Sequence, residues 1–312
     1  MIPYYTTIDT VAFQINCSND SYIQREILYD YKEYLQRTFN PYIDPVEYST
    51  GYGITSIEHK IYCNNRTVLS IQTGYSNYNY YLKIIVAGCS TYDSEVDSTS
   101  KQYLDATVAY FNHNRLPDVL GELDIAIDVP YVGFEHLLAI CTTKTSGTLY
   151  HSLQEPQLYE NETHYVEKFE SDAAKNAATK RAYFYNKTIK ELKKHNHNIG
   201  CQLQRFEVKL QSNFFNRYGL DMLAIEQALN KYHFLYFENL NDKYNIIDRY
   251  SNYSVVTKRE IQRMGLERYR LHFDMEYINN FLYGLQYLTF DDLPAHFSSS
   301  YCNHIQNRNL IY

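Results

Sequence analysis

Tyr185 is the residue of this chain that has the most chemically useful neighbours. It lies in the segment 181–187, which also contains Lys187, and between two strand-like segments that carry acids, 123–129 and 204–210. A free phenol has a pKa of about 10, so it attacks a phosphodiester only when a cation or a base assists it. A tyrosine, a lysine and carboxylates that could bind a metal are the groups needed to cut DNA through a phosphotyrosine intermediate.

The acids of the two flanking segments follow strand spacing. In a strand, residues two and four apart face the same way, so Asp124 and Asp128 share one face. Arg205, Glu207 and Lys209 share a face of the second segment. If the two strands are neighbours, Asp124, Asp128 and Glu207 form an oxygen cluster suited to Mg²⁺ or Mn²⁺. The alternative is a sheet face of alternating charges that is exposed to water.

The number of tyrosines weakens the argument for any single one. The chain has 35 tyrosines and no tryptophan, a bias that AT-rich codon usage explains without any role for the rings. Tyr183 and Tyr185 share a strand face with Arg181 and Lys187, so a half-exposed sheet tyrosine is the ordinary explanation for each. Tyr185 therefore has to be distinguished by its surroundings.

The charge distribution is uneven. The net charge of −7 counts against a nucleic-acid partner. Two local stretches are nevertheless basic, and we expect both to contact DNA with an affinity that falls steeply with salt. Their cations are Lys180, Arg181, Lys190, Lys193, Lys194 and Lys209 in the first stretch, and Lys258, Arg259 and Arg263 in the second. A solvated helix or hairpin is the alternative explanation.

Composition indicates a globular protein of the cytoplasm. A chain of 312 residues with 45% apolar content can form one large domain or two modest ones. The six cysteines are scattered without a CxxC pair, which favours a reducing compartment. We find no apolar run long enough to cross a membrane and no secretion signal at the start, and we expect no membrane partner.

Periodicity predicts a mixture of strands and helices. The first half is expected to contain strands at 8–15, 53–63, 66–73 and 79–87, helices at 21–38 and 100–112, and a loop at 90–99. The second half is expected to contain strands at 122–129, 147–152, 180–187 and 202–211, a short helix near 131–141 and a helix at 219–232. Asn64 and Asn65 fit the turn of a hairpin.

These elements predict an α+β fold with an antiparallel sheet built from two β-α-β-β-β-like units. Residues 9–13 parallel 124–128, and residues 81–87 parallel 205–211. We expect an N-terminal unit at 1–113, a catalytic unit at 114–215 in the same sheet or domain, and a mostly helical region at 216–312.

Other catalytic motifs are weak or missing. His195 and His197 have the spacing of the metal-binding histidine pair of HUH nicking enzymes, but Asn196 lies between them in a polar segment that we interpret as a loop. The phosphate-binding GxxxxGK[ST] loop, the GxGxxG fingerprint and the GxSxG elbow do not occur in the sequence.

Three segments resemble the rolling-circle plasmid replication initiators of the Rep_trans family, the staphylococcal type. Leu123-Asp-Ile-Ala-Ile-Asp128 is similar to the family's Arg-Leu-Asp-Leu-Ala-x-Asp strand. Tyr183-Phe-Tyr-Asn-Lys187 is similar to its Arg-Ile-Tyr-Asn-Lys segment. Gln204-Arg-Phe-Glu-Val-Lys-Leu210 is similar to its Trp-Arg-Val-Glu-Ile-Glu-Leu strand. The order and approximate spacing agree over about 120–212, and the resemblance does not extend beyond 216.

The resemblance implies a HUH-like nicking fold and a role for each matched residue. Tyr185 would be the nucleophile that becomes 5′-phosphotyrosyl, Lys187 and Arg205 would contact phosphate, and the three acids would lie near the metal. It also implies hairpin or single-stranded origin DNA as substrate, a homodimer, a host helicase partner and origin recognition by the C-terminal region. The chain departs from the pattern at Glu122, Val129 and Tyr183, which replace two arginines and an acid.

Two other classes of function stay open. A DNA-binding regulator on a decayed nicking fold would fit the altered flanks of the acidic strand and the acidic net charge. A structural or interaction protein would be supported only by the many tyrosines.

Overall fold

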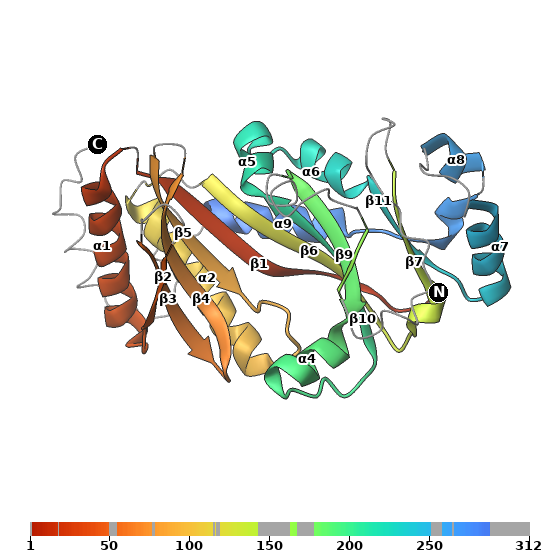
Figure 1. Ribbon diagram of the computed structural model, residues 1–312, viewed down its shortest axis with the longest axis horizontal. Helices are drawn as coiled ribbons and strands as arrows, with labels where there is room; N and C mark the ends of the chain where they lie inside the picture. Colours follow the sequence, from red (N-terminus) through yellow and green to blue (C-terminus); the bar gives the residue numbers. More distant parts are fainter. Residues whose placement is uncertain are drawn as a thin grey trace. The chain divides into compact units, whose positions relative to one another are not determined.

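The chain is described here from a computed structural model (Figure 1). The described residues are 2–17, 19–49, 55–76, 79–114, 116, 119–142, 163–166, 178–250, 258–263 and 265–287. The chain divides into two compact units. Unit 1 consists of Met1–Asp9 and Leu123–Ile278, and unit 2 of Thr10–Glu122 and Asn279–Tyr312. The strands β1 (Tyr5–Asn16) and β6 (Val119–Pro130) each contribute residues to both units.

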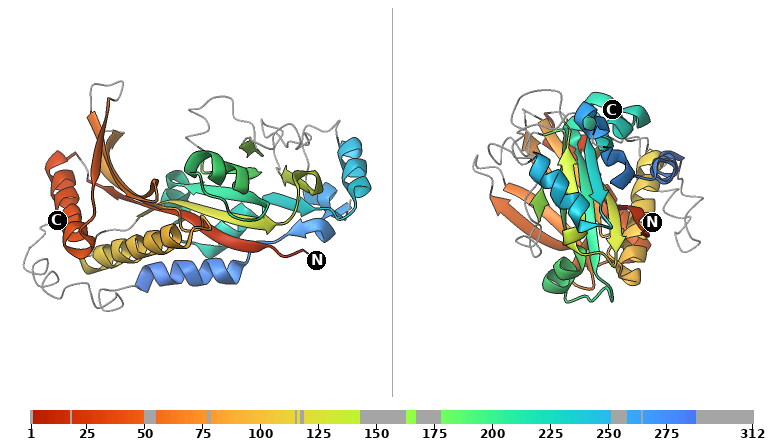
Figure 2. Two further views of the ribbon diagram at one scale, coloured as in Figure 1. Left: turned by 90° about the horizontal axis from the view of Figure 1, so that it is seen from below. Right: turned by 90° about the vertical axis from the view of Figure 1, so that its right-hand side faces the viewer.

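Unit 2 is an antiparallel sheet with two long helices. Its strand order is β2-β3-β4-β5-β1, from β2 (Asp44–Ser49), β3 (Thr55–Cys63), β4 (Arg66–Ser76) and β5 (Asn79–Ala87). The helices are α1 (Ser21–Phe39) and α2 (Ser94–Asn114), shown with the strands in Figure 2. The two helices meet through aromatic rings, since Tyr31 and Tyr34 of α1 both pack on Tyr110 of α2. This aromatic contact fixes the helices on their sheet.

Unit 1 contains the strands that carry the predicted chemistry. Its strand order is β1-β6-β10-β9-β8, with β10 (Leu203–Gln211), β9 (Lys180–Asn186) and β8 (His164–Tyr165). β9 is antiparallel to β10 and to β8. The helix α4 (Lys187–His195) follows β9 without a loop, because the Asn186 side chain accepts a hydrogen bond from the Ile189 amide and caps the helix.

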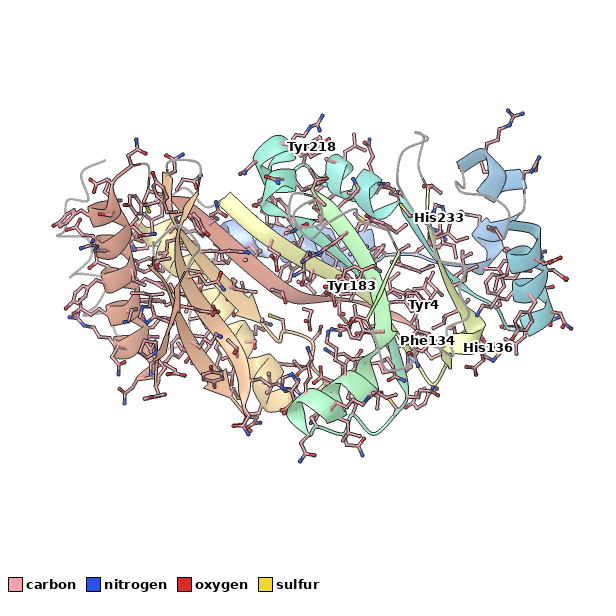
Figure 3. All side chains as sticks on the ribbon, viewed as in Figure 1. Tyr4, Phe134, His136, Tyr183, Tyr218 and His233 are labelled. Carbon is pink, nitrogen blue, oxygen red and sulfur yellow. The ribbon has the colours of Figure 1, made fainter. Side chains whose placement is uncertain are left out.

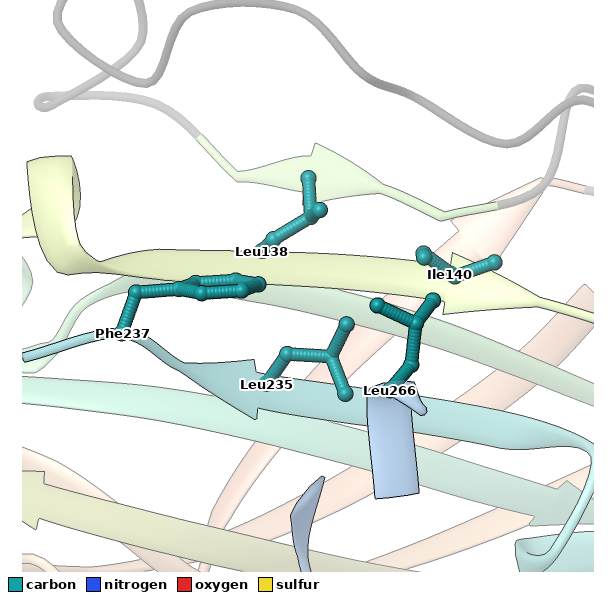
Figure 4. Packing of buried hydrophobic residues seen from close by; sticks show 5 residues of the cluster. All are labelled: Leu138, Ile140, Leu235, Phe237 and Leu266. Atoms are coloured by element: carbon teal, nitrogen blue, oxygen red, sulfur yellow. The ribbon is translucent and has the colours of Figure 1, made fainter. Parts of the chain in front are cut away.

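A smaller sheet covers the apolar face of these strands. Its order is β12-β11-β7, from β12 (Arg270–Leu271), β11 (Tyr232–Tyr236) and β7 (Leu137–Cys141). Phe206 of β10 stacks on Phe234 of β11 with ring centroids 4.5 Å apart. On the opposite side, a second cluster of buried side chains is formed by Leu138, Ile140, Leu235, Phe237 and Leu266 (Figure 4). The smaller sheet is therefore packed on both faces.

Short helices complete the described part of unit 1. They are η1 (Phe134–His136), α5 (Ser212–Tyr218), α6 (Met222–Leu229), α7 (Leu240–Tyr250), α8 (Lys258–Arg263), η3 (Leu266–Tyr269) and the start of α9 (Met275–Tyr287). None of the helices in the described part of the chain has both the length and the apolar character needed to cross a membrane.

The predicted α+β fold class with an antiparallel sheet is confirmed, and most strands lie where periodicity placed them. The hairpin turn is also confirmed, since Asn64 and Asn65 both have positive φ, at 49° and 61°. The predicted strand at 147–152 lies outside the described residues.

Four predicted elements differ from the structure. The expected helix near 131–141 is one 3-10 turn followed by β7, whose five side chains are all buried and gave no alternation to distinguish strand from helix. The expected loop at 90–99 already contains the start of α2, which Asp93 caps. The expected helix at 219–232 is shorter in the structure, because Gly219, with a φ of 59°, ends α5, α6 begins only at Met222, and Tyr232 already belongs to β11. In the second unit the helix α4 lies between β9 and β10, not after the first strand.

Candidate functional site

The residues predicted to do chemistry meet on one face of the unit 1 sheet. In the antiparallel register of β9 and β10, Tyr185 lies opposite Arg205 and Tyr183 lies opposite Glu207. β6, which carries both aspartates, is the other neighbour of β10. The two acid-bearing strands, β6 and β10, are therefore adjacent, as the predicted cluster of acids requires. Figure 3 labels Tyr183 on β9.

The phenol of Tyr185 donates a hydrogen bond to the Glu207 carboxylate. Its oxygen lies 2.8 Å from Oε2 of Glu207. The phenol of Tyr183 donates to the other oxygen, Oε1, of the same carboxylate. The two rings are stacked, with centroids 6.1 Å apart. One carboxylate thus accepts hydrogen bonds from two tyrosines, and it is placed to take a proton from either.

Arg205 binds two carboxylates at once. Its Nε and Nη2 donate to the two oxygens of Asp128 at 2.6 and 2.7 Å, and its Nη1 donates to Asp9 at 2.9 Å. The Arg205 and Asp128 side chains are both fully buried. Thr7 adds a hydrogen bond to Asp128 at 3.2 Å. This bidentate pair is the geometry in which arginine and carboxylate bind most strongly.

The helix α4 brings two lysines to the same face. Lys187 lies 2.9 Å from Glu191 and 3.8 Å from Asp9, and it is buried. Lys190 lies over the ring of Tyr185, with its nitrogen 3.7 Å from the ring centroid. The amine closest to the candidate nucleophile is therefore Lys190. Lys187, which the sequence pattern assigned to that position, begins the helix and turns to Asp9 instead.

Burial governs the titration of the site. Burial, and then the charge of Glu207, raise the pKa of Tyr185 well above its ordinary value, although Arg205 opposes the change. Burial and Glu207 likewise raise the pKa of Tyr183. Burial lowers the pKa of Lys190 to about 8, against the opposing charge of Glu207. Tyr185 is therefore a neutral hydrogen-bond donor at neutral pH, and its oxygen could attack phosphorus only as the proton leaves.

Two further shifts show how strongly the central ion pairs are held. Burial alone would raise the pKa of Asp9, but Lys187 and Arg205 outweigh it and hold the pKa of this carboxyl well below its usual range. Burial would lower the pKa of Arg205, but Asp128 and Asp9 raise it well above its usual range. Arg205 and Asp9 therefore stay charged across the working range of pH.

The three acids predicted to hold a metal have other partners in this arrangement. Asp128 binds Arg205, Glu207 accepts from the two phenols, and Asp124 lies 2.9 Å from the Lys209 amine. Within the described ranges, no three His, Cys, Asp or Glu side chains gather in a way that could hold a metal ion. The donor set as it lies does not fit Mg²⁺ or Mn²⁺, and the metal at Asp124, Asp128 and Glu207 stays a prediction.

The predicted DNA-binding cations are found in three different settings. Lys193 and Lys194 are exposed at the end of α4, and Arg259 and Arg263 are exposed on α8. Lys180 and Arg181 are half-buried at the start of β9. Lys190 and Lys209 belong to the buried polar face, and Lys258 is the first residue of α8. The exposed cations could contact a DNA backbone directly, so their role as DNA contacts stays a prediction that binding measurements can test.

His195 and His197 belong to a helix end and not to a strand. His195 is the last residue of α4, and Asn196 caps the helix in the left-handed conformation with a φ of 52°. The interpretation of this segment as a turn is confirmed.

Sequence reasoning missed three members of the site. Asp9 was noted only as part of a weak internal repeat, yet it binds Arg205. Glu191 is paired with Lys187 through i,i+4 spacing on α4. Tyr183 was noted only for sharing the face of Tyr185, and it proves to be the second donor to Glu207. The period-2 pattern of β9 and β10 was the available signal for Tyr183, whereas Asp9 has no signal without the strand order.

Comparisons with solved structures include a distant likeness to a replication protein. A rolling-circle replication initiator protein from Geobacillus stearothermophilus aligns with 92% of this chain and 98% of its own at 11% sequence identity, with a TM-score of 0.38. A likeness this loose carries no argument about fold or activity. No family model matches the chain, and neither does any curated protein sequence.

Proposed function

We propose that this protein is a rolling-circle replication initiator that nicks and rejoins DNA through a phosphotyrosine at Tyr185. The observation that carries the proposal is the 2.8 Å hydrogen bond from the Tyr185 phenol to Glu207. A nucleophile paired with a base, next to fixed cations, is the arrangement that activates a hydroxyl for attack on phosphorus. The motif resemblance over 120–212 supplies the choice of a DNA phosphodiester as substrate.

The proposed reaction exchanges one phosphodiester for another. Glu207 accepts the phenolic proton as the Tyr185 oxygen attacks phosphorus, and the bond from phosphorus to the 3′ oxygen breaks. The proton passes from Glu207 to the departing 3′ oxygen, which is then free to prime synthesis. The 5′ phosphate stays on Tyr185, and attack by a later 3′ hydroxyl rejoins the strand and restores the phenol. General base catalysis of this kind contributes about 10² to 10⁴-fold in rate.

Fixed cations stabilise the charge that develops in this reaction. Lys190 lies over the Tyr185 ring, where it favours the phenolate. Arg205 lies opposite Tyr185 in the strand pairing and opposes the rise of its pKa. Tyr185 is only 2% exposed, so a DNA strand reaches it only if α4 or a neighbouring segment moves.

A covalent capture experiment tests the proposal. A pool of DNA hairpins with randomised single-stranded loops is incubated with the protein, and DNA that stays attached after denaturation is sequenced. The wild-type adduct is expected to map to Tyr185 by mass spectrometry of nuclease-digested peptides, and Tyr185→Phe should lower its yield at least about 100-fold. No adduct from the wild type, or an adduct that maps outside the site, would contradict the proposal.

The predicted Mg²⁺ or Mn²⁺ forms part of the same proposal, and binding it would require Asp124, Asp128 and Glu207 to exchange their present partners for the cation. A bound cation would polarise the scissile phosphate. Removing divalent cations with EDTA is then expected to stop adduct formation and adding Mn²⁺ to restore it. The melting temperature should stay unchanged, since the three acids already have partners. Undiminished nicking in EDTA would remove the metal from the proposal and leave the role of Tyr185 intact.

The family resemblance also suggests partners. We propose origin DNA, read in part by the region after 216, a homodimer and a host helicase, each to be tested by binding and sedimentation measurements.

The burial of the site favours a second candidate, a DNA-binding regulator that has lost nicking. In such a regulator the Tyr185 phenol would stay buried with its raised pKa, and the acids would keep their present partners, when DNA binds. Hairpin binding with a steep salt dependence, together with no covalent adduct, would establish this alternative.

A further inference from the structure

Tyr131 has an unusual backbone conformation for its residue type. Of the described residues with positive φ, four are glycines, four are asparagines, and the other two are Tyr92 and Tyr131, at 67° and 61°. A bulky side chain is strained in this region, which lowers the folding equilibrium constant by about 5 to 30-fold. Tyr131 also follows Pro130 in a turn, at a position that Gly or Asn ordinarily fills. A tyrosine here therefore destabilises the fold where another residue would not.

The Tyr131 side chain contributes little to the fold. It is 76% exposed. Within the described ranges, this side chain makes no hydrogen bond and no contact with another aromatic ring. Tyr92 is better covered, at 39% exposed, and its amide donates to Asp97 at 3.2 Å at the start of α2. A strained and exposed ring without a structural role points to a contact outside the chain.

The backbone places Tyr131 at the end of the strand pair that carries the candidate site. Its amide donates to the Gln202 carbonyl at 2.7 Å, where β6 ends and β10 begins. Asp128 and Arg205, which bind each other, both lie further into this pair. Because a strand rises about 3.3 Å per residue, Tyr131 is about 10 Å along β6 from Asp128. A DNA strand held at Tyr185, which lies opposite Arg205, would pass close to this end of the sheet.

The first turn of α4 lies at the same end. Thr188 Oγ1 donates to the Cys201 carbonyl at 2.6 Å and accepts from the Leu203 amide at 2.9 Å, so it binds the residues on either side of Gln202. The N-terminus of a helix carries partial positive charge, which favours phosphate groups. An exposed ring beside a positive helix end fits a nucleic-acid strand, whose bases stack on aromatic side chains while its phosphates meet the positive charge.

We propose that Tyr131 stacks on an unpaired base of the DNA strand that the candidate site binds, and so positions the strand next to Tyr185. This inference rests on the proposed function for its choice of DNA as the partner. Every base has a π face, so the ring adds affinity for single-stranded DNA without selecting a sequence. The strain at Tyr131 is then the consequence of keeping an aromatic ring at the end of the sheet.

A single tryptophan can report on the stacking directly. The chain has no tryptophan, so Tyr131→Trp introduces one indole whose emission is unambiguous. The variant is made in a Tyr185→Phe background, in which no covalent adduct is expected. One probe is a single-stranded oligonucleotide of mixed sequence, and the other has the same length and phosphates but no bases. We expect only the first to quench the emission. Equal quenching by both, or none by either, would contradict the stacking role.

Tyr131→Asn separates a ligand contact from a structural role. Asparagine adopts positive φ more readily, so the melting temperature should rise by a few degrees. The affinity for the ordinary single-stranded oligonucleotide should fall by about 5 to 100-fold. A tyrosine that served only the fold would give a lower melting temperature and an unchanged affinity. Tyr92→Asn is the matched control at the other tyrosine with positive φ, and it should leave the affinity unchanged.

The results for Tyr131 and for the proposed function can be told apart. If the wild type forms the Tyr185 adduct and Tyr131→Asn binds the oligonucleotide as tightly as the wild type, the stacking role is wrong and the nicking role stands. If the wild type binds the oligonucleotide without forming an adduct, and Tyr131→Asn binds it weakly, the stacking role stands and the nicking role fails. If the wild type binds no single-stranded DNA, the stacking role fails.

Discussion

The strands of unit 2 and the strands of unit 1 share an order of pairing but differ in what covers one face. In unit 2 the first strand, β1, pairs with the last, β5, and β5 pairs with β4. In unit 1, β6 is next to β10 and β10 pairs with β9. Aligning 81–87 with 205–211, as the internal repeat suggests, makes Gly74 and Gln72 the register counterparts of Tyr185 and Tyr183. The same strand frame thus carries phenols in one unit and none at the matching positions of the other.

The connection between the paired strands accounts for the difference in burial. Only residues 77 and 78 separate β4 from β5, whereas α4 and a following turn separate β9 from β10. The helix brings Lys187 and Lys190 over the polar face of unit 1. In unit 2 the matching face of β5 stays half-exposed at Lys83, which is 3.2 Å from Glu122. A helix inserted between two strands therefore converts an ordinary charged sheet face into an enclosed site.

The largest expected effect is on the rate of adduct formation, when the proposed base Glu207 is replaced. Unit 2 has no carboxylate at the matching position, where Lys83 lies instead. Glu207→Gln keeps a hydrogen-bond acceptor for the phenols but cannot take their proton. We expect adduct formation to slow by about 10² to 10⁴-fold, measured as single-turnover rates on a captured hairpin. Glu122→Gln in unit 2 is the control and should leave the rate unchanged. An equal loss in both variants would show that the comparison of the two faces is wrong.

The next effect is on stability. Arg205→Met removes the cation that binds the buried Asp128 carboxylate through two hydrogen bonds, which should lower the free energy of unfolding by about 3 to 5 kcal/mol. Lys83→Met breaks the more accessible pair with Glu122 and should cost about 1 kcal/mol or less. Urea denaturation of both variants measures the difference. Similar costs would mean that the two faces are equally accessible to water.

A smaller effect concerns the pH dependence of stability. The pKa of Lys190 is about 8 in the folded protein, against 10.5 for an ordinary lysine. Between these values the unfolded chain binds more protons, so raising the pH should stabilise the fold. The gain is on the order of 3 kcal/mol, and it is complete above pH 10.5 and absent below pH 8.

A variant without the Lys190 amine isolates the contribution of this lysine to the pH dependence of stability. The free energy of unfolding of the wild type minus that of Lys190→Met should rise between about pH 8 and pH 10.5. Urea denaturation of both proteins at several pH values measures this difference. Lys194→Met, on the exposed end of the same helix, is the matched control. A flat difference for Lys190→Met would show that the Lys190 amine is more hydrated than its position over Tyr185 indicates.

The smallest effect is on DNA binding. Arg263→Ala on α8 removes an exposed cation, and it should weaken hairpin binding by less than about tenfold and lower the slope of log affinity against log salt by about 1. Arg217→Ala removes an exposed cation of α5 instead and serves as the control. Binding isotherms at several salt concentrations measure both. An unchanged slope for Arg263→Ala would exclude α8 from the DNA contact.

Much of the fold could be predicted from local patterns. The alternation in 122–129 and 202–211 placed β6 and β10 and the residues that share their faces, because strand period needs no tertiary information. β7 could not be identified because its five residues are all buried in a packed sheet and show no period. Elements that are buried on both sides lose the pattern that would identify them.

The candidate site was predictable in its members but not in its pairings. Tyr185, Arg205 and Glu207 follow from motif and spacing. The partner of each charge depends on which strands are neighbours and on where Asn186 ends β9. That is why Lys190, and not Lys187, lies over the ring of Tyr185, and why Asp9 was missed. A sequence pattern reports which residues share a face, but not which opposing charges they meet.

The bond between Arg205 and Asp9 has a consequence for the order in which the protein is made. It joins residues 196 positions apart, and synthesis produces the acid long before the guanidinium. A growing chain has Asp9 and Asp128 before it has Arg205, so the edge of β6 cannot pair with β10 until β10 emerges from the ribosome. The candidate site therefore matures late in translation, and a chain that ended before β10 would lack both Arg205 and Glu207.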